Sequence, residues 1–330
     1  MDKSELKDFA GRYREAITRR LWDQWTAIGG GGYALSPKPV TWAVDLEALI
    51  LASSNLFSCE PRLREVVLAW ILSHGGLISI ARLKRMQQGY AFGDAGAMAD
   101  LAETLLVTNP SMRSWKSIAT WAPRIAVKEA KPFQKAGITV RFQPDRDACL
   151  FLTLRSLLGV SSRVEILFWL NYNSRAQVSW MARETVWYGK TVQQALNEMV
   201  LSGHVREDNE STYRRYQIVP SEWSAFFPKR DFLEIWLGQH HLYAGVFGIL
   251  KTLLRCAGDE MAEDAARFLI VEELRKGYDA HRRAREHLAG GSRSPGTLIG
   301  VIAQVVENIE SSTDWPTGAF STDPHRCQFD

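Results

Sequence analysis

The chain has 330 residues, of which 46% are hydrophobic and 23% are charged. This composition is typical of globular proteins and excludes the collagen-like, disordered and disulfide-scaffold classes. The 40 Lys and Arg residues outnumber the 37 Asp and Glu residues only slightly, so the whole-chain charge neither requires nor excludes a polyanionic partner. The length predicts two or three domains, each large enough to fold around its own core.

Cysteine spacing and hydropathy bear on metal sites and on the cellular compartment. The cysteines stand singly, without a Cys-x-x-Cys pair, which argues against structural zinc and against a redox pair. No window approaches about 18 uncharged apolar residues, and Met1 to Phe9 lacks the apolar segment of a secretion signal. We therefore expect a cytoplasmic protein with no membrane partner, no metal and no cofactor. The cysteines are Cys59, Cys149, Cys256 and Cys327.

The N-terminal region, residues 1–108, is predicted to be helical. Apolar residues recur at helical spacing between Leu6 and Ile28, and the glycines at 29–32 end this helix. Further apolar helical faces follow, with a break at Pro61. Residues 109–147 then form a basic connection with four prolines and eight basic against three acidic residues, which predicts a boundary between domains. The stripe of the first helix comprises Phe9, Tyr13, Ile17, Leu21 and Trp25.

Residues 148–230 show the most regular pattern in the chain. Apolar periodicity predicts helices over 162–172, 178–185 and 191–202, and Gly203 follows the third as a left-handed C-terminal cap. Val192 and Leu196 lie on the apolar face of this third helix. Two short strands are predicted over 204–207 and 213–219, on either side of a polar turn that begins at Asp208.

Three helices followed by a hairpin resemble the winged helix-turn-helix family of DNA-binding transcriptional regulators, and the residues of 162–223 carry the resemblance. Val178-Ser179-Trp180-Met181-Ala182-Arg183 is similar to the second helix of that family, and Lys190-Thr191-Val192-Gln193-Gln194-Ala195-Leu196-Asn197 to the start of its recognition helix. Tyr213-Arg214-Arg215-Tyr216-Gln217-Ile218 resembles the returning strand of the wing. The turn before the recognition helix departs from the family, because Tyr188 stands where a Ser or Thr cap is usual.

The resemblance implies a site for double-stranded DNA. A major groove admits one α-helix, whose Lys, Thr, Gln and Asn side chains reach base edges and phosphates, while cations on the wing bind phosphates or enter the minor groove. Lys190, Gln193 and Gln194 are expected to be exposed on that helix. The predicted DNA-binding residues are Lys190, Thr191, Gln193, Gln194, Asn197, Arg206, Arg214 and Arg215.

A second, degenerate winged helix is one reading of the N-terminal region. Residues 63–86 parallel residues 164–185, with Ile78-Ser79-Ile80-Ala81-Arg82 in place of Val178 to Arg183, and Met98 to Leu106 supplies a third helix. No clear hairpin follows, so an ordinary helical bundle fits the pattern equally well.

The C-terminal region offers a catalytic alternative. Arg275 with His281, and Arg282 with His287, have spacings that resemble the Arg-to-His motif of HEPN ribonucleases, although a salt-bridged exposed helix explains the same residues. Phosphate-binding loops, dinucleotide fingerprints and nucleophile elbows are absent from the sequence. We therefore expect no enzyme. Residues 231–310 are predicted to form a helical domain for dimerisation or sensing, and 311–330 a flexible tail.

The sequence thus favours a mainly α protein with a winged helix-turn-helix and a small β-hairpin wing, flanked by N-terminal and C-terminal helical regions. Its expected function is that of a bacterial-type, sequence-specific transcriptional regulator that binds double-stranded DNA as a homodimer. The alternatives are a HEPN-like RNA-acting enzyme and a winged helix used for protein interaction. The sequence names no small-molecule effector.

Overall fold

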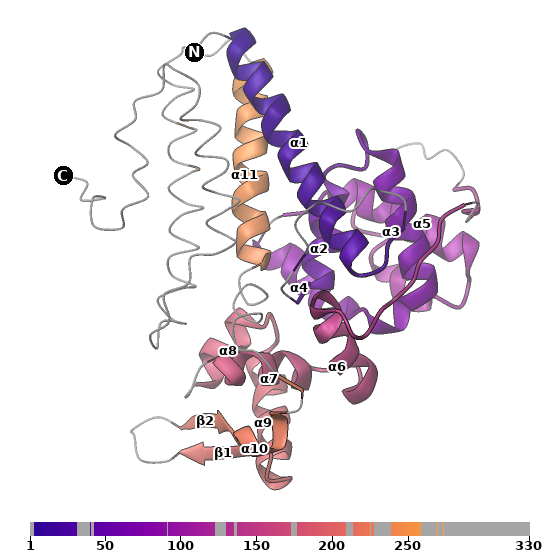
Figure 1. Ribbon diagram of the computed structural model, residues 1–330. Helices are drawn as coiled ribbons and strands as arrows, with labels where there is room; N and C mark the ends of the chain where they lie inside the picture. Colours follow the sequence, from indigo (N-terminus) through magenta and orange to yellow (C-terminus); the bar gives the residue numbers. More distant parts are fainter. Residues whose placement is uncertain are drawn as a thin grey trace, which may run out of the picture.

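The computed structural model describes residues 3–31, 40, 43–90, 92–122, 130–134, 137–172, 177–208, 214–224, 226–227, 239–258, 269 and 273. These residues are mainly helical and include one two-stranded antiparallel sheet, which confirms the predicted mainly α class (Figure 1). The helices are α1 Lys3–Ala27, α2 Leu46–Ser54, α3 Pro61–His74, α4 Ile80–Tyr90, α5 Ala95–Thr108, α6 Leu150–Leu158, α7 Ser162–Tyr172, α8 Val178–Glu184, α9 Gly189–Leu201, α10 Pro220–Trp223 and α11 Gln239–Gly258. Short 3-10 turns are η1 Gly75–Leu77, η2 Arg113–Ser117 and η3 Asp147–Cys149, and the strands are β1 Val205–Asp208 and β2 Arg215–Ile218.

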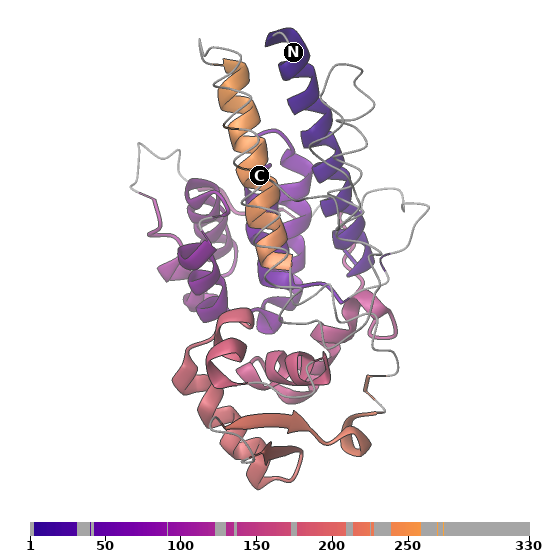
Figure 2. The same cartoon turned by 90° about the vertical axis from the view of Figure 1, so that its left-hand side faces the viewer.

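Among the described residues, the first and last long helices, α1 and α11, lie side by side (Figures 1 and 2). The predicted apolar stripe of α1 is buried as expected. The hydroxyl of Tyr13 donates to the carbonyl of Val246 at 3.2 Å, and the hydroxyl of Tyr243 donates to Oε1 of Gln24 at 2.7 Å. The start of the predicted C-terminal domain therefore packs on the N-terminal helices.

Helices α2 to α5 form the interior of the N-terminal region. Every residue of α2 is buried, and the Asp45 carboxylate caps the helix by accepting from the amide of Ala48. Pro61 begins α3, where its missing N–H costs no helical bond. The indole of Trp70 donates to the carbonyl of Ile28 at 3.0 Å, which joins α3 to the end of α1.

The three helices α3, α4 and α5 occupy the segment in which a second winged helix is predicted. Between α5 and residue 122 the structure describes no strand, so a wing has no counterpart there. The second winged helix stays a prediction.

Part of the basic connection packs against the N-terminal core instead of extending away from it. Trp115 is buried, and the amide of Arg141 donates to the carbonyl of Gly29 at 2.8 Å. Gly29 has φ +92°, and a Cβ there would lie 2.0 Å from the carbonyl oxygen of Arg141. Only glycine fits this close approach.

No single described helix is long and apolar enough to cross a membrane. The segments Pro61–Leu77 and Ile80–Tyr90 pass that test only as a pair, and they are bent by 117° relative to each other.

The segment from α7 to β2 follows the predicted order of helices and strands. The helix over 162–172 is confirmed, the third helix begins two residues earlier than predicted, and Gly203 ends it with φ +79°. The strands pair antiparallel with Val205 opposite Ile218 and Asp208 opposite Arg215. Helix α9 packs against α7 and α8, and β2 packs against α7, so the hairpin and α9 share one small core.

The apolar face of α9 is where sequence and structure agree most closely. Val192 and Leu196 are fully buried, as predicted, whereas Leu201 at the end of the same helix is 89% exposed. Truncation of a buried leucine leaves a cavity, and truncation of an exposed one does not.

We predict that Leu196→Ala lowers the free energy of unfolding by about 2–5 kcal/mol, measured by urea denaturation. The matched variant Leu201→Ala removes the same atoms from the same helix and is expected to change that value by less than about 0.5 kcal/mol. Equal effects of the two substitutions would contradict the placement of α9.

Candidate nucleic-acid interface

The outward face of α9 carries most of the predicted DNA-binding side chains. Lys190, Gln194 and Asn197 are exposed, and Thr191 is partly exposed. The amide of Gln194 donates to Oε1 of Glu198 at 3.2 Å, a contact at the surface. This face therefore offers one cation and two amides to solvent over its first three turns.

Gln193 differs from its prediction, because it is half-buried and not exposed. Its amide nitrogen donates to Oδ1 of Asn197 and to the hydroxyl of Tyr216, both at 2.8 Å. The physical reason is its position next to Val192 and three residues before Leu196, on the flank of the buried stripe. Gln193 thus connects α9 to β2.

The hairpin brings the three predicted arginines together on one ribbon. Arg206 is exposed and lies opposite Gln217, while Arg215 is partly exposed. Arg214 is exposed, and its Nε lies 3.3 Å from Oε1 of Glu207 on the facing strand. A phosphate that binds Arg214 must therefore compete with Glu207.

The turn between α8 and α9 contains a strained residue. Val186 has φ +59°, which is rare for a β-branched side chain, and it is buried. Tyr188, the residue before α9, makes no side-chain cap bond and is 62% exposed. The left-handed conformation of Val186 costs about 1–2 kcal/mol and persists only where surrounding contacts impose it.

The surrounding contacts come from the N-terminal helices and α11, which hold the C-terminal end of α8. The hydroxyl of Tyr90 donates to the carbonyl of Arg183 at 3.2 Å, and Nε2 of His241 lies 3.3 Å from Oε2 of Glu184. Burial, with a smaller contribution from Glu184, raises the pKa of Tyr90 to about 12, so its hydroxyl stays a donor at neutral pH. Tyr90 thus adds a side-chain bond to a helix-end carbonyl that also accepts from the backbone N–H of Val186.

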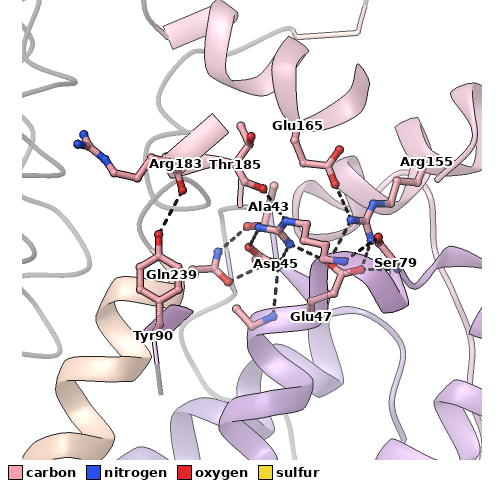
Figure 3. Close-up of polar contacts among 12 residues, drawn as sticks. Ala43, Asp45, Glu47, Ser79, Tyr90, Arg155, Glu165, Arg183, Thr185 and Gln239 are labelled. Carbon is pink, nitrogen blue, oxygen red and sulfur yellow. Dashed lines mark hydrogen bonds and ion pairs between the residues drawn. The ribbon is translucent and has the colours of Figure 1, made fainter. Parts of the chain in front are cut away.

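Arg82 of α4 also bonds to the end of α8 and begins a buried ion cluster, of which Figure 3 labels Asp45, Glu47, Arg155 and Glu165. Its Nε donates to the carbonyl of Thr185 at 2.9 Å. Its two terminal nitrogens bind both oxygens of Asp45 at 2.7 and 2.6 Å, and Nη1 also binds Glu47 at 2.8 Å. The amide of Gln239 reaches the same place, since its Oε1 accepts from the backbone N–H of Asp45.

Arg155 of α6 extends the cluster to α7. It lies between Glu47, at 2.5 and 3.0 Å, and Glu165, at 2.6 Å. Nη1 of Arg155 also donates to the carbonyl of Leu77, and the amide of Ser79 donates to Glu47. The ionisable side chains of the cluster are at most 1% exposed. The buried ion cluster, defined as Asp45, Glu47, Arg82, Arg155 and Glu165, was not foreseen in the sequence.

The cluster holds three carboxyl groups against two guanidinium groups, and the two glutamates differ. Burial alone would raise the pKa of Glu47, but Arg155 and Arg82 bind it on both sides and hold its pKa below the ordinary value. Burial raises the pKa of Glu165, which only Arg155 contacts directly. Among the described residues no donor reaches Oε2 of Glu165. Glu165 therefore takes up a proton more readily than Glu47 does.

We predict that Glu165→Gln is tolerated and changes the pH dependence of stability. Because the folded-state pKa of Glu165 is raised, the folded protein holds a proton that the unfolded chain releases, so this contribution is present at low pH and is lost as pH rises above about 4.5. The free energy of unfolding of the wild type should fall relative to that of Glu165→Gln as pH increases from 4.5, measured by urea titration at several pH values.

The matched variant Glu47→Gln removes a carboxylate that two guanidinium groups share. It is expected to lower the free energy of unfolding by about 3–5 kcal/mol at pH 7, because each arginine is left partly uncompensated in the interior. If Glu165→Gln is as costly as Glu47→Gln, Glu165 is ionised in the folded protein.

In the described part of the chain, no group of three or more His, Cys, Asp or Glu side chains is placed to hold a metal ion. The motif residues Arg275, His281, Arg282 and His287 lie outside the described residues, as do the predicted tail and most of the predicted C-terminal domain. Comparison with family models, with curated proteins and with solved structures finds no match to this chain.

Proposed function

We propose that residues 162–223 form a winged helix and that the protein binds double-stranded DNA through α9 and the β1–β2 hairpin, as a sequence-specific transcriptional regulator. Support comes from the order and packing of the elements. Helix α9 is anchored to α7 and α8 by Val192, Leu196 and Met199, and the hairpin packs behind it on α7. This arrangement leaves the opposite side of α9 open to a groove.

The observation that carries the proposal is the chemistry of that open side. Lys190, Gln194 and Asn197 are exposed on one helix, and lysine and amide side chains are those that bind guanine and adenine edges in the major groove. An acid beside them, Glu198, is paired with Arg163 of α7. Its negative charge is thus compensated before a phosphate approaches.

The hairpin supplies cations beside α9. The bond from Gln193 to Tyr216 fixes the ribbon against the helix, so Arg206 and Arg215 keep a set distance from the α9 face. Arginine side chains on a ribbon at this place suit the phosphate backbone or the adjacent minor groove.

A cytoplasmic homodimer on a palindromic site is part of the proposal. Two-fold protein symmetry would match two half-sites about 34 Å apart. This part rests on the sequence, since residues 274–330 lie outside the described residues.

The central test is a gel shift at fixed salt on fragments of the source genome. The wild type is expected to select specific fragments, and Lys190→Ala and Gln194→Ala should each weaken the selected complex by about 1–3 kcal/mol, or roughly 5- to 150-fold in Kd. Lys251→Ala, which removes an exposed lysine from α11, is the control and should bind as the wild type does. Selective binding that survives both α9 substitutions would refute the role of α9, and the absence of any shift would favour a protein-interaction module.

A second prediction concerns the hairpin. Phosphate contacts carry no sequence information, so Arg214→Ala with Arg215→Ala should weaken specific and non-specific binding alike and flatten the slope of log affinity against log salt by about 1–2. Glu207→Gln should act in the opposite direction, because it frees Arg214 from its carboxylate partner. An unchanged slope in the double variant would mean that these arginines do not touch DNA.

A further inference from the structure

Helix α4, outside the proposed winged helix, carries an unusual distribution of charge. Its sequence contains Arg82, Lys84 and Arg85 and has no Asp or Glu. Arg82 points into the buried ion cluster, whereas Lys84 and Arg85 are partly exposed and Gln88 is exposed. The outer side of α4 therefore carries two cations and no carboxylate.

Arg85 of α4 lies next to the residue that precedes α9. Its guanidinium carbon is 3.8 Å from the ring centre of Tyr188, the residue that precedes α9. Stacking of this kind uses the flat face of the guanidinium group and holds it in place. Its N–H groups point outward in the plane of the group, where they remain able to donate.

Two hydrogen bonds keep α4 next to the turn between α8 and α9. Arg82 binds the carbonyl of Thr185 and Tyr90 binds that of Arg183, so both ends of α4 are bonded to the end of α8. Arg85 stacks on Tyr188, two positions before Lys190, so Arg85 and Lys190 lie on elements that are joined to each other.

The cations Lys84, Arg85 and Lys190 differ from Arg163 and Arg214 in whether a carboxylate is bound to them. Arg163 and Arg214 have glutamate partners. For Lys84, Arg85 and Lys190, no carboxylate lies within ion-pair distance in the part of the chain that the structure describes. Unpaired cations bind a phosphate without first breaking an ion pair, which favours them as anion contacts.

We infer that α4 makes a second contact with the same duplex, in which Arg85 and Lys84 bind backbone phosphates next to the groove that α9 enters. This inference rests on the proposed function and deepens it, because it adds a part of the N-terminal helical region to the DNA-binding surface. The contact is to phosphate, so it raises affinity without selecting sequence.

The test uses the full-length protein and a fluorescein-labelled random-sequence duplex of about 30 base pairs, with anisotropy titrations over a range of salt. Lys84→Gln with Arg85→Gln should reduce the slope of log affinity against log salt by about 1–2. Lys251→Gln with Arg255→Gln removes the same charge from exposed positions on α11 and should leave the slope unchanged. Arg85→Lys keeps the charge and should retain most of the slope.

The outcomes separate this inference from the function on which it rests. If the α4 double variant keeps the wild-type slope while Lys190→Gln loses affinity, α4 does not contact DNA and the proposed function stands. If the α4 double variant binds more tightly than the wild type, α4 covers α9, and the inference is overturned. If the wild-type protein binds no duplex, the proposed function itself fails. Thermal denaturation of each variant shows that a lost slope reflects lost contacts and not unfolding.

Discussion

Burial of charge is the constraint on which this structure depends. Arg82 and Arg155 are removed from water, and each is compensated only because carboxylates from other segments meet it with short, partly bidentate bonds. Through backbone carbonyls and Gln239, the same groups reach α2, α4, α6, α7, α11 and the end of α8. Helix α7, at the centre of the proposed winged helix, is therefore bonded to the N-terminal helices through Glu165, and the two parts share one continuous hydrophobic core.

This constraint explains how the α8–α9 turn keeps an unfavourable shape. Val186 adopts a left-handed conformation where glycine is the usual choice, and the bonds to Arg183 and Thr185 on its N-terminal side fix the backbone that enters the turn. The direction of α9 is thus set partly by α4. A change in the N-terminal helices or in the first turn of α11 would act on α9 through these few bonds.

Local periodicity predicted those elements whose cores lie within the same stretch of chain. The α1 stripe, the helix over 162–172, the buried face of α9 and the hairpin all follow from spacing and turn residues. The buried ion cluster did not, because its members come from four separate segments and Arg, Asp and Glu ordinarily lie at the surface. Gln193 was misplaced for a related reason, since a residue on the flank of a stripe is exposed or buried according to what packs beside it. Periodicity also says nothing of which helix covers another, so the pairing of α1 with α11 was not foreseen.

The pairing of α1 with α11 joins segments 233 positions apart, as the bond between Tyr13 and Val246 shows. During synthesis on the ribosome, at roughly 5–20 residues per second, α1 waits on the order of ten to fifty seconds before its partner helix exists. Throughout that interval the side of α1 that α11 will cover faces solvent with its apolar residues uncovered. The chain therefore completes its fold late. A nascent chain that stops before residue 239 lacks α11, so the apolar side of α1 that α11 covers stays exposed and can bind chaperones.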